Sequence, residues 1–116
     1  KDKSLDQYET LFLKNNETST LYRVAFLQFE LKRYKESLAS TEILLNRTDI
    51  NDQTLFFPKI DNTQQEVSMR SALLHLKGLI AKEEGDIQKA KEFYLEALKV
   101  SPGFEIAQKN LQEASK

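Results

Sequence analysis

The stretch from Gly85 to Pro102, GDIQKAKEFYLEALKVSP, places the tightest constraint on the fold of this chain. Ala90, Tyr94 and Ala97 recur three or four positions apart, which places them on one face of a helix. The Gly-Asp pair before them suits a turn and a helix N-cap, and the Ser-Pro pair after them suits a helix end. Two small residues around one aromatic residue leave room for a second helix to pack closely. We therefore expect this helix to pack against a neighbouring helix.

The rest of the chain also shows helical periodicity, and its three glycines and two prolines are few among 116 residues. We expect six helices and no strand. Two helix starts carry their own signals: the T-x-x-E pattern from Thr63 to Glu66 is typical of a capping box, and Asp86 suits an N-cap. The expected organisation is one domain over residues 1–116, with a helix at 4–14, helix pairs in 18–49 and 66–102, and a last helix at 103–115.

Residues 50–65 interrupt the helical periodicity, and we expect an inserted loop there. The segment is rich in Asp and Asn, yet it also contains Leu55, Phe56, Phe57 and Ile60. A pair of phenylalanines is costly to leave in water, so we expect the loop to pack back on the helices. A loop of this length inside a compact domain is often functional.

The spacing in residues 71–104 resembles that of the tetratricopeptide repeat, a helix–turn–helix unit of 34 residues. Gly78 stands at the small position of the first helix. The second helix supplies the remaining small, aromatic, small and proline positions with Ala90, Tyr94, Ala97 and Pro102. The resemblance implies an all-α fold, built as a right-handed α-solenoid of antiparallel helix–turn–helix pairs. The alternative is an unrelated helical bundle.

Residues 18–49 resemble a degenerate copy of the same repeat, which begins 53 positions before residue 71. Ala25 matches the small position of the first helix, but Thr41 stands where the aromatic residue is expected. Against a unit of 34 residues, this offset leaves extra residues, which the loop at 50–65 and an extended start of the next helix absorb. The last helix, at 103–115, resembles the start of a further repeat that serves as a cap.

The resemblance also implies a binding surface, because the first helices of such repeats line a concave groove that receives a peptide or a helix. Carried over to this chain, the groove residues are Tyr22, Phe26, Phe29, His75, Leu79 and Lys82. An exposed apolar surface of this kind marks an interaction site. The alternative is that these aromatic residues belong to the core, covered by the helix at 4–14 or by Phe56 and Phe57 of the loop.

The expected function is therefore a non-catalytic scaffold that binds a protein or peptide partner. The alternative is a self-association domain, such as a homodimer, or a regulatory module of a larger protein that is exported or anchored in a membrane. The chain begins at Lys1 rather than at Met. If an upstream signal has been removed, the protein is periplasmic or exported, and otherwise cytoplasmic; the sequence leaves the compartment unknown.

Composition argues against several other functions. A net charge of −1 disfavours nucleic acid as a partner, and no apolar run reaches the roughly 18 residues that cross a bilayer. The absence of cysteine removes disulfides and thiolate metal sites, and a lone histidine is more often a packed or surface residue than a ligand. No nucleotide-binding or hydrolase motif is present. We therefore expect no catalytic residues, no metal and no cofactor.

Overall fold

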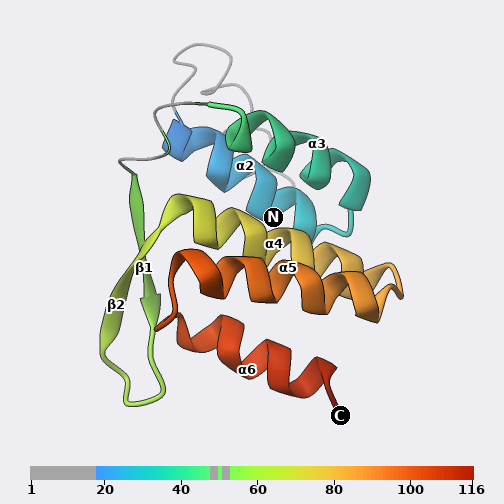
Figure 1. Cartoon of the computed structure of the whole chain (residues 1–116). Helices are drawn as coiled ribbons and strands as arrows, with labels where there is room; N and C mark the ends of the chain where they lie inside the picture. The colour runs from blue at the N-terminus through green and yellow to red at the C-terminus, as the bar shows by residue number, and fades with distance from the viewer. Residues whose placement is uncertain (1–17, 48–49, 51–52) are drawn as a thin grey trace. The chain divides into compact units, whose positions relative to one another are not determined.

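The computed structural model describes residues 18–47, 50 and 53–116 (Figure 1). The chain divides into two compact units. The first unit is Lys1–Asp49 and the second is Ile50–Lys116. The helix predicted at 4–14 lies outside the described residues. The single domain and the right-handed solenoid stay predictions.

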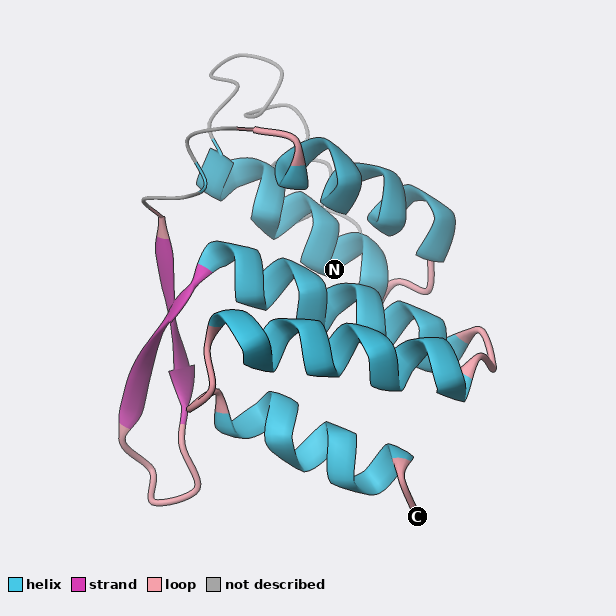
Figure 2. Ribbon diagram, viewed as in Figure 1, coloured by secondary structure: helices cyan, strands magenta, loops and turns pink. Residues whose placement is uncertain are grey.

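The described part of the chain is mostly helical, as expected, but it is not all-α because it contains a two-stranded sheet (Figure 2). The first unit contributes the helices α2 (Thr18–Glu30) and α3 (Tyr34–Leu45). The second unit contributes β1 (Thr54–Pro58), β2 (Gln64–Ser68), α4 (Met69–Glu83), α5 (Ile87–Val100) and α6 (Glu105–Ala114).

In the first unit, α2 and α3 form a helix pair whose crossing is held by buried polar side chains. Ala25 and Ser37 are fully buried, and the Ser37 hydroxyl donates to the main-chain oxygen of Ala25 at 2.7 Å. One turn further along α3, the Ser40 hydroxyl donates to the side-chain oxygen of Gln28 at 2.8 Å. Small residues bring the two helices close enough for both bonds, and each bond satisfies a buried polar group.

In the second unit, α4 and α5 form a helix pair whose crossing is set by a glycine. A Cβ atom built on Gly78 would lie 2.5 Å from Cε1 of Tyr94, so the aromatic ring occupies the space that a side chain at Gly78 would need. Tyr94 and Ala90 are fully buried beside it. The two helices therefore approach each other closely at Gly78.

The two helix pairs turn in the same way. One residue in each turn has a positive φ angle, which is 65° at Lys32 and 87° at Gly85. Its main-chain N–H donates to the C=O of the residue three positions earlier, and the N–H of the next residue donates to the C=O five positions earlier. This is the Schellman pattern of a helix C-terminus. The bonds run from Lys32 to Phe29 and from Arg33 to Gln28 in the first turn, and from Gly85 to Lys82 and from Asp86 to Ala81 in the second. Each donor and each acceptor of the second turn lies 53 positions after its counterpart in the first turn.

The predicted loop at 50–65 is wrong, because most of this segment belongs to an antiparallel β-hairpin. Leu55 lies opposite Val67, and Phe57 lies opposite Gln65. These four residues are buried or half-buried, whereas their neighbours along both strands are mostly exposed. The alternation of period two is that of a strand with one covered face. The expected absence of strands is corrected accordingly.

The capping box predicted from Thr63 to Glu66 is also wrong, because β2 continues to Ser68. Ser68 is the N-cap of α4, and its hydroxyl oxygen accepts the N–H of Arg70 at 3.2 Å. The second N-cap prediction is confirmed: the Asp86 carboxylate accepts the N–H of Lys89 at 3.1 Å.

The last helix, α6, packs on α5 through small residues. Ala97 of α5 forms one buried cluster with Val67, Phe104 and Ala107. Because Ala97 is small, the segment that starts α6 packs directly against α5 at this position. The helix begins at Glu105 rather than at residue 103, because Pro102 and Gly103 form a turn.

Candidate functional site

An aromatic row runs along α2 in the first unit. The ring centroids of Tyr22 and Phe26 are 6.5 Å apart, and those of Phe26 and Phe29 are also 6.5 Å apart. Tyr34, at the start of α3, extends the row with a centroid 5.8 Å from that of Phe29. Phe26 is 38% exposed, whereas Tyr22 and Phe29 are half-buried. Burial raises the pKa of Tyr22 to about 12, so its hydroxyl is neutral near pH 7 and can take part in neutral hydrogen bonds.

On α4, the three predicted groove residues differ in exposure. Lys82 is exposed and Leu79 is half-buried, whereas only 6% of His75 is exposed. The His75 ring lies between the rings of Tyr94 and Phe104, with centroid distances of 5.6 and 5.3 Å. His75 therefore belongs to the packing of α4 in the second unit.

His75 also connects α4 to α6 by a hydrogen bond. The side-chain amide of Asn110 lies 2.8 Å from Nε2 of His75, and an amide N–H can donate only to an unprotonated ring nitrogen. Burial lowers the pKa of His75 to about 4, so the ring is neutral near pH 7 and is able to accept this bond. The bond fixes the position of Asn110 on the surface above His75.

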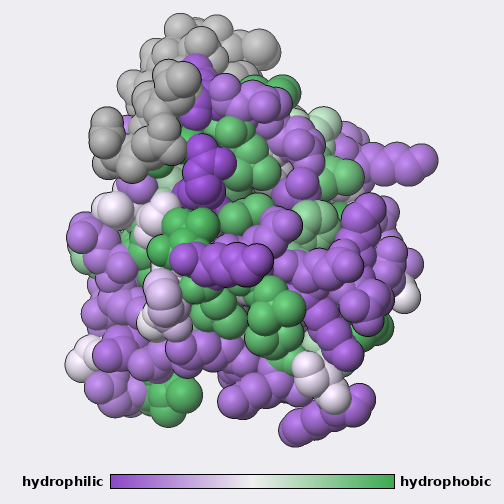
Figure 3. Space-filling view, in the orientation of Figure 1, coloured by the Kyte–Doolittle hydropathy of each residue, from purple (hydrophilic) through white to green (hydrophobic). Residues whose placement is uncertain are grey.

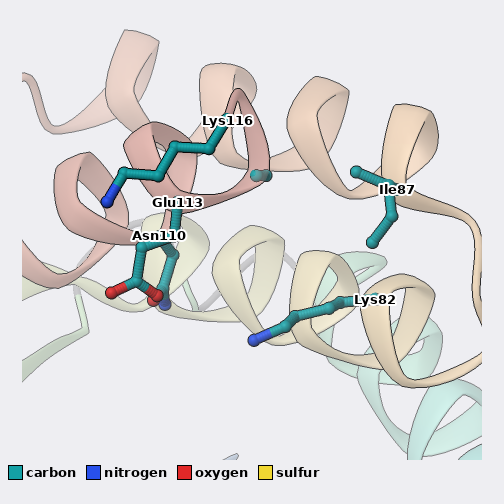
Figure 4. Close-up of a pocket in the computed structure, with 6 residues that line it drawn as sticks. Lys82, Ile87, Asn110, Glu113 and Lys116 are labelled. Carbon is teal, nitrogen blue, oxygen red and sulfur yellow. The ribbon is translucent and has the colours of Figure 1, made fainter.

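Asn110 lines a pocket of about 280 Å³ formed by residues of α4, α5 and the C-terminal part of the chain. Figure 4 shows Lys82 extending from α4 toward Asn110 and Glu113 of α6, with Ile87 of α5 at the other side. Ala114 and Lys116 complete the lining. Two ammonium groups, a carboxylate and an amide thus surround a small apolar floor, an arrangement that suits the mixed groups of a polypeptide.

The sequence interpretation missed the contribution of α6 to this pocket. Asn110 and Glu113 lie on a helix that was expected only to cap the fold. Their spacing of three residues places them on one helical face, which is the signal that could have identified them. Nothing in the sequence alone indicates that this face meets Lys82.

The β-hairpin holds its two phenylalanines in different environments. Phe57 packs against Phe104 with a centroid distance of 4.9 Å, whereas Phe56 is 66% exposed. The prediction that the segment packs back on the helices is therefore right for Phe57 and wrong for Phe56. Near the tip of the hairpin, Ile60 is 85% exposed, and Figure 3 shows a small apolar patch at this end among hydrophilic residues.

The hairpin is fixed to the start of α6 by polar contacts at Glu105. The Glu105 carboxylate accepts the N–H of Ile60 at 3.0 Å and lies 3.7 Å from the ammonium of Lys59. The Gln65 side chain accepts the N–H of Glu105 at 3.0 Å and donates to the main-chain oxygen of Gly103 at 2.7 Å. Together with Phe57, these contacts hold one face of the hairpin against the helices and leave the other face exposed.

Among the residues that the structure describes, no three His, Asp or Glu side chains are grouped as metal ligands. None of the described helices is both long and apolar enough to span a bilayer.

The predicted groove residues lie in both units, with Tyr22, Phe26 and Phe29 in the first and His75, Leu79 and Lys82 in the second. Their assembly into one groove stays a prediction. Residues 71–104 match the family model described as tetratricopeptide repeat, a range that contains most of α4 and all of α5. No match was found among curated proteins.

Proposed function

We propose that this chain, whose residues 71–104 match the tetratricopeptide repeat, is a non-catalytic module that binds a peptide or helix of a partner protein. The repeat is generally an interaction scaffold. The proposal goes further, because it assigns the contact surface to the pocket formed by α4, α5 and α6.

One observation carries the assignment: α4, the first helix of the matched repeat, and α6, the helix that follows the repeat, contribute polar groups to the same pocket. Lys82 comes from α4, and Asn110 and Glu113 come from α6. A bound segment would contact an ammonium, an amide and a carboxylate within one small area. His75 acts from beneath by holding Asn110 in position, so its role is to orient a pocket residue rather than to touch the partner.

The aromatic row of α2 supports a second contact surface within the first unit. Phe26 is exposed on one side and is flanked by the rings of Tyr22 and Phe29. Aromatic side chains lose little conformational freedom on binding and are enriched among the residues that dominate binding energy. This surface suits an apolar side chain of a partner.

Selection from a random peptide library displayed on phage tests the proposal without knowledge of the natural partner. Peptides that bind the immobilised protein are synthesised, and their affinities are measured by fluorescence anisotropy. We expect Lys82→Glu to weaken binding at least about tenfold, a loss of about 1.4 kcal/mol. Lys99→Glu is the matched control, because this exposed lysine in the last turn of α5 receives the same change of charge outside the pocket.

The aromatic row has its own pair of variants. Phe26→Ala should weaken the binding of peptides that contact the first unit. Ile43→Ala, at an exposed position on α3, should leave their binding unchanged. If library selection yields no peptide above background, the proposed function is overturned. If selected peptides bind Lys82→Glu and Phe26→Ala as well as they bind the unaltered chain, both contact surfaces are wrong.

A further inference from the structure

The two edges of the β-hairpin differ in the main-chain groups that they present. The N–H of Lys59 donates to the oxygen of Thr63, and the N–H of Met69 donates to the oxygen of Gln53. In an antiparallel ladder, hydrogen-bonded and outward-facing residues alternate along each strand. The odd-numbered residues of β1 therefore pair with β2, and the N–H and C=O groups of Thr54 and Phe56 point away from it.

These outward groups are not used within the described part of the chain. Among the described residues, no hydrogen bond joins the outward main-chain groups of Thr54 or Phe56 to another element. An unpaired strand edge is a template for another strand, and proteins usually protect such edges with charged side chains. β1, with the sequence TLFFP, has no charged residue along its whole length.

The outer edge of β2 is protected. Glu66 lies at its centre, and the strand then runs directly into α4 after Ser68. The Glu66 carboxylate accepts the hydroxyl of Thr54 at 3.0 Å, so it is held on the exposed face of the sheet. The hairpin thus has one charged edge and one uncharged edge, and the uncharged edge carries the exposed ring of Phe56.

We propose that β1 pairs with β1 of a second copy of this chain, antiparallel, about a two-fold axis that passes beside Phe56. Phe56 of each copy would then donate its N–H to the C=O of Phe56 in the other. The N–H of Thr54 in each copy would donate to the C=O of Pro58 in the other. The two Phe56 rings would lie on the same face of a four-stranded sheet, where directly opposite side chains contact each other.

A second copy fits this edge because the segment is complementary to itself. When two copies of β1 pair antiparallel about Phe56, no like charges meet, because residues 54–58 carry no charge. Pro58 lacks an N–H, so pairing ends there, and the two-fold axis makes the pair of copies a closed dimer. Growth beyond four strands is opposed because Glu66 of each copy lies on the new outer strands.

The small size of the contact predicts a weak dimer. Two strands of five residues bury much less than the roughly 1,600 Å² of a standard stable interface, so association is expected only at high protein concentration. The contacts of Phe57 and Gln65 with the start of α6 hold the hairpin in its paired shape before binding, which lowers the entropy cost of association. The inference is independent of the proposed peptide-binding function.

Sedimentation velocity from about 10 μM to about 1 mM tests the proposal on the full chain, because this range covers the affinities of small interfaces. The sedimentation coefficient should rise with concentration. Phe56→Lys should hold the chain as a monomer throughout, because two ammonium groups would meet at the axis. Ile60→Lys is the matched control, since it adds the same charge at an exposed position outside the paired strand and should leave association unchanged. Circular dichroism checks that both variants fold.

Hydrogen exchange supplies a second readout that identifies the edge. Exchange of the Phe56 amide should slow as the protein concentration rises. A chain that stays monomeric over the whole range overturns the proposal, as does a Phe56→Lys variant that associates like the unaltered chain. Slow exchange of the Phe56 amide in dilute monomer would overturn it too, because another segment of the same chain would then cover the edge.

Discussion

The two helix pairs of this chain share one turn geometry but hold their helices together in different ways. In the pair of α4 and α5, a glycine on one helix accommodates the ring of Tyr94 on the other. In the pair of α2 and α3, Ala25 and Thr41 stand at the positions of Gly78 and Tyr94, and the Ser37 hydroxyl bonds to the main chain of Ala25 instead. The same backbone arrangement is thus compatible with an apolar contact or with a buried hydrogen bond.

The first helices of the two pairs also differ in their chemistry. Tyr22 occupies in α2 the position that His75 occupies in α4, 53 residues later, and Phe29 corresponds in the same way to Lys82. At these two positions the first helix of one pair is aromatic, whereas that of the other carries a histidine and a lysine. The comparison separates what the fold requires, which is small residues at the crossing, from what each surface is able to bind.

Acid should distinguish the two pairs most strongly. The folded pKa of His75, about 4, lies below the ordinary histidine value of 6.5, so the unfolded chain binds more protons between these two values. Stability is therefore full above about pH 6.5 and falls as the pH drops toward 4, by about 3 kcal/mol in total. Tyr22, at the equivalent position, does not titrate in this range, because a phenol ionises only near pH 10 and burial raises the pKa of Tyr22 further, to about 12. Hydrogen exchange between pH 7 and 4 should show amides of α4 and α6 losing protection before those of α2 and α3.

His75→Gln is the control for this prediction, because glutamine offers an oxygen to the Asn110 amide but does not titrate. The selective loss of protection in α4 and α6 should disappear in this variant. Equal acid sensitivity in the variant and the unaltered chain would mean that carboxylates, and not His75, cause the loss.

The glycine at the crossing should give the next largest effect. Gly78→Ala is expected to destabilise the fold by about 2 kcal/mol, because the new methyl group overlaps the Tyr94 ring in a packed core. In a Tyr94→Thr background, which reproduces the combination found in the first pair, the same change should cost less than about 0.5 kcal/mol because helix propensity favours alanine. Chemical denaturation of the four proteins of this cycle measures the coupling. Equal costs in both backgrounds would contradict the steric explanation.

The helix pair in 71–104 could be predicted because its signal is local. Gly78, Ala90 and Tyr94 are close in sequence, and their sizes alone indicate how near two helices must approach. The hairpin could not be predicted in the same way. Three apolar residues in a row, Leu55, Phe56 and Phe57, do not show the apolar–polar alternation that is typical of a strand. Glu66 fits the sequence pattern of a helix capping box, although it lies opposite Phe56 in the sheet.

The candidate site was less accessible to prediction than the fold. The bond between His75 and Asn110 joins residues 35 positions apart, and the sequence holds no pattern that connects them. Lys82 was expected on a binding surface because of its position in the repeat. Its neighbours Asn110 and Glu113 depend on how α6 packs, which is decided by Ala97, Phe104 and Ala107 rather than by the pocket residues themselves.

The two turns should give the smallest effect, with opposite signs. Lys32 and Gly85 both have positive φ, but a side chain is strained there and glycine is not. Lys32→Gly should therefore stabilise the first turn, and Gly85→Ala should destabilise the second, each by about 1 kcal/mol in chemical denaturation. No atom outside the turn lies within 4 Å of a Cβ built on Gly85, so the cost of Gly85→Ala comes from the backbone alone. If Lys32→Gly destabilises the chain, contacts of the lysine side chain outweigh the strain, and the two turns are alike in hydrogen bonding but not in energy.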